Sequence, residues 1–545
     1  MKYLFIYLFI FGVGAFANQT YPEGEPVPRY LTAREKATLM KTPLKARSSD
    51  QTPVAPTLCP AEYDPTGAIL LTYDGGSSWK HILDQMAAHI TTTGNADVIV
   101  MADDQIEADA ILANMTAAGA DPQRVVPLVA QTDTIWIRDY GPRFVYEGGC
   151  RAIINHTYNR PRPADDALPE FFGHAFGHPV YDLPLIHGGG NFHLFSSAST
   201  GAGHATELIL NENPDLTETQ IVQYWYQYQN LNTTIEEAYP GFIDSTQHID
   251  MWMIPVSADS VIISDWPMDS GSTQDLICDS VAQRLSLEGK TVYRVPARSV
   301  SGTHYTYTNS VICNDLVLIP LFTNTSVTAH NDEALAVWQN AVPGKTVVQI
   351  DCEELAWASG VMHCIAMHYP HFLGDTDPLV YSPADLAGQT LMSGETIELP
   401  YVSDDDKAVE SVSIELSLDS GVTYQETVAD GLTPFDTYSW TVPRFWSDQV
   451  RIRFSAHDIE GRTGYFTQET DFSIRYERNC PSDVYPPMQG DGNVDELDRN
   501  QMLLSWHAAE PYFDIYPFSS PIEMGDGKID IRDILMVQNN FGGCP

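Results

Sequence analysis

The stretch that decides the interpretation of the chain is Gly360-Val-Met-His-Cys-Ile-Ala-Met-His368, with Cys364 at its centre. A thiol becomes a strong nucleophile as the thiolate, which a neighbouring cation, a helix end or a polar environment favours. A single cysteine is more often buried and inert. Four other stretches also carry polar residues among aromatic and apolar ones: Trp136-Ile-Arg-Asp-Tyr-Gly-Pro142, His187-Gly-Gly-Gly-Asn191, Gln247-His-Ile-Asp-Met-Trp252 and Thr308-Asn-Ser310. Nucleophilic sites are assembled from scattered residues in this way, so the sequence predicts a cysteine site.

The polar residues of these stretches also have simpler interpretations. Asp139 would pair with Arg138 or cap a turn before Gly141, and Asn309 would cap a turn ahead of a buried strand. Asp250 lies two residues after His248, so on a strand both side chains would project from one face, a base beside a carboxylate. For each residue alone, the simple interpretation is favoured. The occurrence of all these polar residues in one chain favours a common functional site.

Two arginines stand out in an acidic chain, in Tyr158-Asn-Arg-Pro-Arg-Pro163. The prolines stiffen the backbone, and the guanidinium groups of Arg160 and Arg162 are suited to binding a carboxylate. The alternative is a surface loop in which these arginines pair with Asp165 and Asp166.

The N-terminus has the pattern of an exported protein. Residues 1–17 combine Lys2, a short apolar run and a small-x-small end, which predicts a signal peptide. Residues 18–60 are polar and proline-bearing, which predicts an extended leader or linker, with a pro-segment as one interpretation. No later stretch is long enough to span a membrane. We therefore expect a secreted, extracellular or cell-surface protein.

The composition argues against nucleic-acid binding. Against 72 Asp and Glu there are only 29 Lys and Arg, a formal net charge of −43, whereas phosphate neutralisation needs a basic surface. Such acidity suits cationic substrates, calcium or a salty habitat, and solubility alone would also explain much of it.

Residues 61–376 show an α/β pattern. Short apolar runs alternate with helix-like segments, as they do in one large α/β domain. The runs are Ala68–Leu71, Ala96–Met101 and Leu316–Pro320, and the helix-like segments include Trp79–Ile90 and Asp104–Ala118.

The five stretches, in this order, resemble the Porphyromonas-type bacterial peptidylarginine deiminase family, which also contains the agmatine deiminases. The resemblance covers roughly residues 59–375. It implies the pentein fold, a five-bladed α/β propeller with the site at its centre, and no cofactor for catalysis. In the implied reaction Asp139 and Asp250 hold a guanidinium group, Cys364 attacks its central carbon, and His248 transfers protons. Asn309 orients the cysteine end and Trp136 walls the guanidinium.

The resemblance also bears on the substrate. Arg160 and Arg162 match the stretch that holds the substrate α-carboxylate in the peptidylarginine members, which implies a peptide or protein ending in arginine. Agmatine lacks a carboxylate and would leave both arginines unpaired. Agmatine or another small guanidine is the alternative substrate. A papain-like protease shares the residue types, but its surroundings of the cysteine differ.

Two further regions follow the α/β pattern. Period-two alternation in Val412–Leu418 and Val450–Phe454 predicts half-buried strands, and residues 385–476 resemble an immunoglobulin-like β-sandwich. Residues 480–545 contain a Gly-Asp-Gly sequence twice, at Gly490 and Gly525. The two repeats resemble the calcium loops of dockerin-type domains. This resemblance implies a small α-helical domain with a cohesin-like or cell-surface partner. A calcium-dependent adhesion protein with an inactive catalytic domain is the non-enzyme alternative.

The dockerin resemblance implies calcium ligands in each repeat. Neither repeat has a typical ligand at the first and third loop positions, so an insertion is inferred after Asp483 and Asp514, which become the displaced first ligands. The implied ligands are Asp483, Asp491, Asn493, Asp495 and Asp498 in the first repeat, and Asp514, Asp526, Lys528, Asp530 and Asp533 in the second. Asn493 and Lys528 would act through the backbone. Cys480 and Cys544 bracket the tail, which predicts a disulfide between them.

Overall fold

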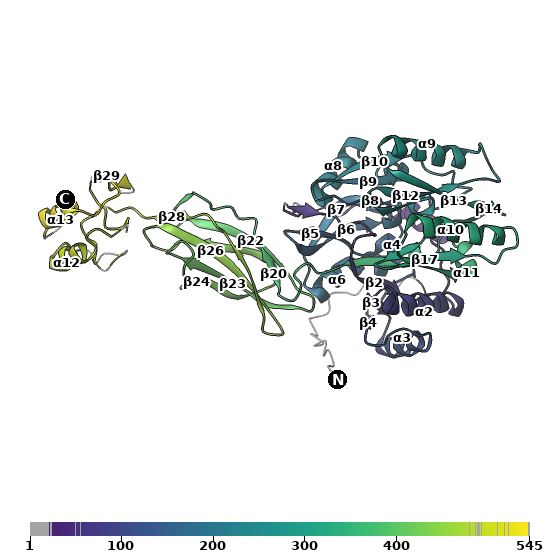
Figure 1. Cartoon of the computed structure of the whole chain (residues 1–545), viewed down its shortest axis with the longest axis horizontal. Coiled ribbons are helices and arrows are strands. Elements are labelled where there is room, and N and C mark those ends of the chain that lie inside the picture. Colours follow the sequence, from purple (N-terminus) through teal and green to yellow (C-terminus); the bar gives the residue numbers. More distant parts are fainter. Residues whose placement is uncertain are drawn as a thin grey trace. The chain divides into compact units, whose positions relative to one another are not determined.

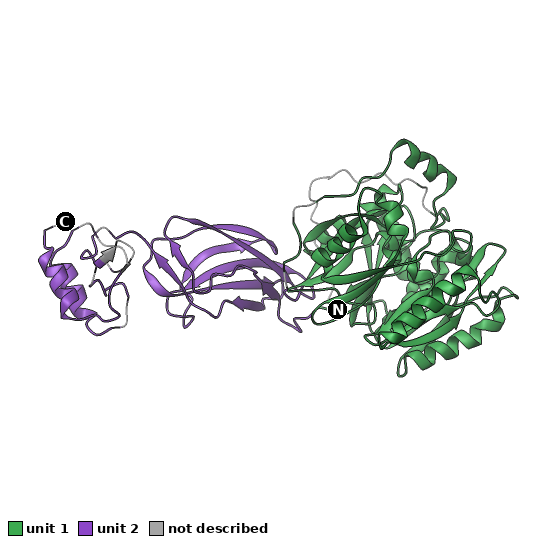
Figure 2. Cartoon of the chain, turned by 90° about the horizontal axis from the view of Figure 1, so that it is seen from above, with its two compact units in different colours: residues 1–147, 151–372 green, residues 148–150, 373–545 purple. Residues whose placement is uncertain are grey.

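The computed structural model describes residues 21, 24–48, 51–54, 56–478, 480–485, 487, 491, 493–508, 511–516, 518–520 and 523–542. The chain forms two compact units, residues 1–147 with 151–372 and residues 148–150 with 373–545 (Figure 2). The predicted signal peptide lies outside the described residues and stays a prediction. Within the described part, none of the helices has the length and apolar character needed to cross a membrane.

The described part of the first unit contains five sheets of three or four strands and one two-stranded ribbon. Across each sheet in turn, the strands are β19 (Met367–Pro370), β2 (Thr66–Thr72), β3 (Asp97–Ala102) and β4 (Val125–Val129); β1 (Thr57–Leu58), β5 (Arg143–Glu147), β6 (Cys150–Tyr158) and β7 (Val180–His187); β10 (Leu231–Glu236), β9 (Gly201–Thr206) and β8 (His193–Phe195); β11 (Met253–Ser257), β12 (Ser260–Asp265) and β13 (Thr291–Pro296); and β16 (Val311–Cys313), β17 (Leu316–Leu321) and β18 (Thr346–Asp351). The ribbon pairs β14 (Arg298–Val300) with β15 (Thr303–Tyr305).

Four of these sheets repeat one arrangement. The central strand, which is β2, β9, β12 or β17, has an antiparallel neighbour on one side and a parallel neighbour on the other. Parallel neighbours need a crossover, and its longest helix in each sheet is α2 (Ser77–Thr92), α8 (Glu218–Gln229), α9 (Thr273–Leu287) or α10 (Asn331–Ala341). Figure 1 shows α2, α8 and α9 at the periphery of this unit. The last strand, β19, pairs with β2, so the unit closes on its own beginning.

The predicted α/β pattern of this unit is confirmed, because its apolar runs form the central strands. Ile69, Leu70 and Leu71 on β2 are fully buried. Helix α2 buries Trp79, Ile82, Leu83, Met86, Ala87 and Ile90, the spacing of one helix face. The remaining described helices are α3 (Gln105–Ala117), α4 (Ile137–Tyr140), α5 (Pro163–Asp166), α6 (Leu168–Phe176), α7 (Leu208–Glu212) and α11 (Glu353–Ala356).

The leader is not the extended linker that its composition predicts. Residues Ala33–Lys41 form helix α1, and Thr32 begins it with a capping box. The Thr32 hydroxyl accepts from the Glu35 backbone N–H, and the Glu35 carboxylate accepts from the Thr32 backbone N–H. The proline content predicts an extended chain, but the Thr32-x-x-Glu35 capping motif starts a helix here.

The second unit contains two sheets that share one buried cluster. One sheet has β20 (Leu379–Tyr381), β22 (Thr396–Asp404) and β25 (Asp436–Thr441), and the other has β21 (Thr390–Met392), β28 (Phe472–Arg475), β26 (Ser447–Asp458), β23 (Val409–Ser417) and β24 (Glu426–Leu432), with β27 (Thr463–Thr467) beside β26. The alternating residues Val412, Ile414 and Leu416 are buried, as the period-two pattern predicts.

The tail repeats one local structure twice. Helices α12 (Glu496–Leu504) and α13 (Ile531–Asn539) begin after Asp495 and Asp530, each with a capping box to the aspartate three residues later. Between them a short ribbon pairs β29 (Phe518–Ser520) with β30 (Glu523–Met524). Cys480 is disulfide-bonded, while its predicted partner, Cys544, lies outside the described residues.

Candidate active site

The five sequence motifs occupy similar places in the five sheets. Four lie just before or at a strand on the edge of a sheet: His187–Asn191 before β8, Gln247–Trp252 before β11, Thr308–Ser310 before β16 and Gly360–His368 at β19. The fifth, Trp136–Pro142, precedes β5, which lies between β1 and β6. Short helical turns hold the key residues, in α4, η1 (Gly189–Asn191), η2 (Ile249–Met251) and η4 (His363–Ile365). This repetition explains why motifs far apart in sequence meet.

The structure brings the predicted catalytic residues together around a guanidinium group from the chain itself. The group belongs to Arg29, in the leader. Arg29 and the five predicted residues, Cys364, His248, Asp250, Asp139 and Asn309, are all fully buried. Sequence reasoning missed Arg29, which is one of several leader arginines and carries no local signal of its own.

Asp139 and Asp250 hold this guanidinium from two edges. Arg29 Nε and Nη2 donate to the two Asp139 carboxylate oxygens at 2.9 and 2.7 Å. Arg29 Nη1 and Nη2 donate to Asp250 at 3.2 and 3.0 Å. Such paired charge-assisted bonds fix both position and plane. Burial works against ionisation of both carboxyl groups, yet the guanidinium brings the pKa of Asp139 and of Asp250 below the usual range.

Cys364 and His248 contact the amino ends of the same guanidinium. The Cys364 Sγ lies 2.6 Å from Arg29 Nη1, and His248 Nδ1 lies 2.7 Å from Nη2. His248 Nε2 has no hydrogen-bond partner among the described residues. The arrangement places a nucleophile and a proton-transfer group on one planar cation, as amidine chemistry requires.

The charge on Cys364 depends on that cation. Burial raises the pKa of the Cys364 thiol well above its usual range, the carboxylates of Asp250 and Asp139 raise it further, and the Arg29 guanidinium opposes them. The Arg29 guanidinium is therefore the neighbouring cation that favours the thiolate.

Asn309 positions the cysteine loop. Its side-chain oxygen accepts from the backbone N–H groups of Val361 and Cys364 at 3.1 and 3.4 Å, and it lies 3.2 Å from the Cys364 Sγ. The turn-cap interpretation of Asn309 is thus partly right, but the loop that it caps carries the nucleophile.

The glycines of His187–Asn191 make room for the guanidinium. A Cβ on Gly190 would overlap Arg29 Nη2, and it would lie 2.7 Å from Asp250 and 2.8 Å from Asp139. A Cβ on Gly188 would lie 2.8 Å from the His248 ring. Only glycine fits between these groups, so the motif acts through its lack of side chains.

Arg160 and Arg162 contact the leader backbone beside Arg29. Arg160 Nε donates to the Arg29 carbonyl at 3.1 Å, and Arg162 Nη2 donates to the Pro28 carbonyl at 2.7 Å. Arg162 Nε also pairs with the Glu35 carboxylate at 2.7 Å. The surface-loop alternative is wrong, because both arginines are buried. Of its two aspartates, Asp166 pairs with Arg47 and Asp165 accepts from Thr134.

Trp136 lies beside the cysteine loop. Its indole Nε1 donates to the Val27 carbonyl at 2.8 Å, and its ring is 2.6 Å from where a Cβ on Gly360 would lie. Trp136 therefore contacts the leader backbone two residues before Arg29, and its ring limits the space next to Cys364.

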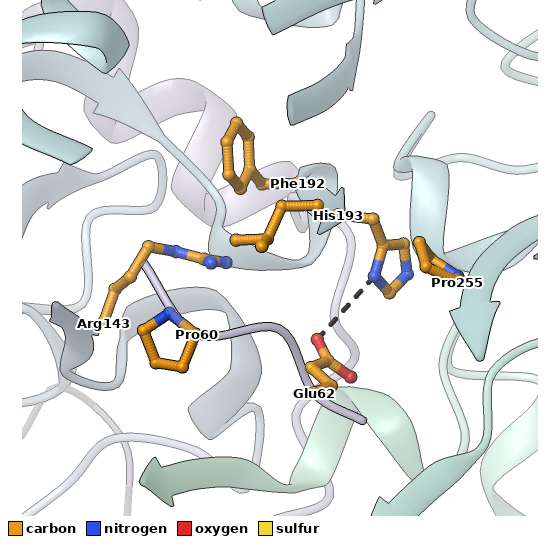
Figure 3. Close-up of a pocket in the computed structure, with 7 residues that line it drawn as sticks. Pro60, Glu62, Arg143, Phe192, His193 and Pro255 are labelled. Atoms are coloured by element: carbon orange, nitrogen blue, oxygen red, sulfur yellow. Dashed lines mark ion pairs between the residues drawn. The ribbon is translucent and has the colours of Figure 1, made fainter. Parts of the chain in front are cut away.

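A charged relay behind the site was also missed by sequence reasoning. His363 Nδ1 lies 2.9 Å from Asp250, its Nε2 lies 2.9 Å from Glu62, and Arg138 donates to Glu62 at 2.9 Å. His363 adjoins Cys364, which is a usable signal, whereas Glu62 has none. Figure 3 shows Glu62 and His193 facing each other beside a small pocket, 3.7 Å apart.

This relay has the residue types of a metal site. Glu62, His193 and His363 place one ligand atom each within 4.8 Å of one another. The Arg138 guanidinium already pairs with Glu62 there, and a cation would have to displace it. The cluster is better explained as an ion-pair network that fixes Asp250.

Comparison with known proteins identifies the family. A sequence model described as Porphyromonas-type peptidyl-arginine deiminase matches residues 58–370, more than half of the chain. The chain belongs to this family. Putative agmatine deiminases are among its curated relatives: that of a Shewanella species is 24% identical over 299 residues, 46% of this chain and 79% of the relative. That of Photobacterium profundum is 22% identical over 362 residues, 57% of this chain and 95% of the relative.

A solved structure supports the fold. A putative agmatine deiminase with 18% sequence identity aligns with a TM-score of 0.50 over 58% of this chain and 96% of its own. The catalytic unit is therefore a pentein-type deiminase with mixed α/β structure. Deiminases of this family are hydrolases of C–N bonds that act without a cofactor.

Proposed function

We propose that this protein hydrolyses the guanidinium of peptidyl-arginine, preferably at a C-terminus, to give citrulline and ammonia. The observation that carries the proposal is the arginine side chain held by Asp139, Asp250, His248 and Cys364. It supports a guanidinium as the group on which the site acts, since both carboxylates and the thiol find partners on one planar cation.

The reaction follows from these contacts. The Cys364 thiolate attacks the central guanidinium carbon and gives a tetrahedral adduct. His248 protonates one amino group, the C–N bond breaks, and ammonia leaves a covalent S-alkylthiouronium. His248 then removes a proton from a water that attacks the same carbon, and the C–S bond breaks to release the thiolate and the ureido product. One water is consumed and one ammonia released.

The carbonyl of Arg29 supports the preference for a C-terminal arginine. This carbonyl accepts from Arg160, so in a C-terminal residue the α-carboxylate would lie at the same place and form a charge-assisted bond. Agmatine would leave that place empty and Arg160, 5% exposed, without this partner. The names of the relatives keep agmatine as the second candidate.

Three substrates test the proposal: a peptide ending in arginine, the same peptide amidated after the arginine, and agmatine. We expect ammonia release and a mass gain of about one dalton with the free C-terminus. We expect a kcat/KM about tenfold lower with the amide, whose carbonyl can still accept from Arg160 but carries no charge. Arg160→Ala should remove this difference mainly through KM.

Arg124→Ala is the matched control, because Arg124 pairs with Asp97 and Asn95 away from the site, and it should keep the preference. Turnover of agmatine alone would move the function to the small-molecule branch. Absence of turnover with any guanidine by folded, reduced protein, both wild type and Arg29→Ala, would refute the deiminase proposal.

We further infer that the five sheets are the blades of an α/β propeller and that residues 385–476 are an immunoglobulin-like sandwich. The repeated strand arrangement and the pairing of β19 with β2 support the first. The two sheets around one buried cluster support the second.

The disulfide at Cys480 supports export, because disulfides persist outside the cytosol. Peptides ending in arginine, and a cohesin-like or cell-surface protein at the tail, are the partners that we propose.

We also infer that the tail binds calcium in both repeats. Asp483 accepts from the Asp491 backbone N–H at 2.9 Å, and Asp514 accepts from that of Asp526 at 3.0 Å. The two displaced aspartates therefore occupy equivalent places, as first ligands of two loops would. Among the described residues the tail carboxylates do not gather into a group of three within 4.8 Å, so the ion would draw them together.

Calcium should raise the melting temperature of the tail. At a calcium concentration a hundred times Kd, one site contributes about 2.7 kcal/mol. Replacing both Asp483 and Asp514 by asparagine should remove the effect, whereas Asp471→Asn, in the sandwich, should not. Calorimetry with calcium and then EDTA measures it. An unchanged melting temperature in wild type would contradict calcium binding.

A further inference from the structure

We propose that the leader holds the enzyme latent, as an intramolecular inhibitor that places Arg29 in the substrate position. The inference rests on the proposed function, because it identifies the guanidinium site as the place of catalysis. It assigns a role to residues 24–48, whose sequence indicated only a leader or a pro-segment.

The contacts of Arg29 are those of a substrate. Every nitrogen of its guanidinium contacts a predicted catalytic group: Nε contacts Asp139, Nη1 contacts Asp250 and Cys364, and Nη2 contacts Asp139, Asp250 and His248. A guanidinium fully removed from water needs this many charged partners, since burying an unpaired charge costs several kcal/mol. The carboxylates of the site therefore compensate the buried charge of Arg29, and Arg29 compensates theirs.

The backbone on both sides of Arg29 is also held. The Arg29 N–H donates to the Ala358 carbonyl at 3.0 Å, in the loop that precedes Cys364. The carbonyls of Val27, Pro28 and Arg29 accept in turn from Trp136, Arg162 and Arg160. A peptide substrate would need the same donors, so the leader and a substrate compete for them.

Two anchors farther along the leader hold it to the same unit. Glu35 of α1 pairs with Arg162. Arg47 donates to both Asp166 carboxylate oxygens at 2.9 Å, and its backbone N–H donates to Thr157 at 2.9 Å. An occupant tethered in this way acts at a high effective concentration, which a free peptide must exceed.

The docked leader leaves the reacting atoms inaccessible. Cys364, His248, Asp139 and Asp250 are each 0% exposed, so an external arginine reaches them only after Arg29 withdraws. The apparent affinity for substrate then falls in proportion to the fraction of molecules with an open site. Removal of the leader, or loss of the charge on Arg29, raises that fraction.

Arg29→Ala in the full chain tests the proposal. We expect kcat/KM for a C-terminal arginine peptide to rise at least about tenfold, as it would if fewer than about one molecule in ten were open in the wild type. Arg29→Lys keeps a charge but loses the planar fork, and should give a smaller rise. Arg34→Ala is the matched control, because Arg34 is exposed on the same leader.

A second measurement does not depend on deiminase activity. Alkylation of Cys364 by iodoacetamide at pH 9, followed by peptide mapping, should be faster in Arg29→Ala than in wild type and Arg34→Ala. Faster alkylation without turnover of any guanidine would support the latent state and refute only the deiminase function. The mass of the peptide containing residue 29 is recorded in the same experiment.

Citrulline at residue 29 in wild type, absent in Cys364→Ala and independent of protein concentration, would also support the proposal, because Arg29 must then have entered its own site. The proposal fails if residue 29 remains arginine while wild type, Arg29→Ala and Arg34→Ala agree in both kcat/KM and Cys364 alkylation. Melting temperatures of the variants confirm that each is folded.

Discussion

Cys364→Ala is expected to lower turnover of an arginine peptide by about 10⁴-fold or more, the largest effect of any single change. Among the described cysteines, Cys364 is the one whose thiol contacts the Arg29 guanidinium, 2.6 Å from Nη1. Alanine removes the covalent step altogether. The two carboxylates remain, so the variant should still bind arginine, and KM or the dissociation constant should change little. Steady-state ammonia release and intact mass after a single turnover measure both effects.

Cys352→Ala is the matched control, since Cys352 is a fully buried thiol outside the site. Wild type should also accumulate a thiouronium adduct at low temperature, seen as added mass on the Cys364 peptide, and the Cys364→Ala variant should not. Retention of even a hundredth of wild-type turnover by Cys364→Ala would exclude the covalent mechanism.

The parts of the site that sequence reasoning predicted share one structural cause. Asp139, Asp250, Asn309 and Cys364 each lie just before a strand of a different sheet, and each motif contains residues with special backbone or charge requirements. Local sequence therefore marks them. The apolar runs of the central strands are equally local, which is why Leu316–Pro320 coincides with β17 to within one residue.

The parts that were missed depend on contacts between distant segments. Arg29 has a role because a site assembled from residues more than 100 positions away accepts its side chain. Its neighbours in the sequence form no motif that would distinguish it from Arg34 or Arg47. Glu62 likewise gains its role only from His363 and Arg138. The proline content of the leader predicted an extended chain, whereas tertiary contacts and the Thr32 cap give it a docked conformation.

Asp139→Asn is expected to lower kcat/KM at least about a hundredfold. Asp139 accepts from two guanidinium nitrogens in a fully buried place, and an asparagine would turn an N–H₂ group toward one of those donors and remove the charge. Breaking one side of a buried charged pair costs about 3 kcal/mol or more, and each 1.36 kcal/mol is a factor of ten in rate. Asp97→Asn, at a partly exposed ion pair with Arg124, should change kcat/KM less than twofold.

The same substitution should have the opposite effect on access to the thiol, because Asp139 also holds Arg29. Losing that carboxylate weakens the docked leader, so iodoacetamide should alkylate Cys364 faster in Asp139→Asn than in wild type even as turnover falls. Loss of the fold would also expose the buried thiol of Cys364, so the melting temperature of Asp139→Asn is measured beside the two rates. A lowered melting temperature would show that Asp139 acts on stability, whereas slower turnover with faster alkylation at an unchanged melting temperature requires one carboxylate to serve the substrate and the leader at the same place.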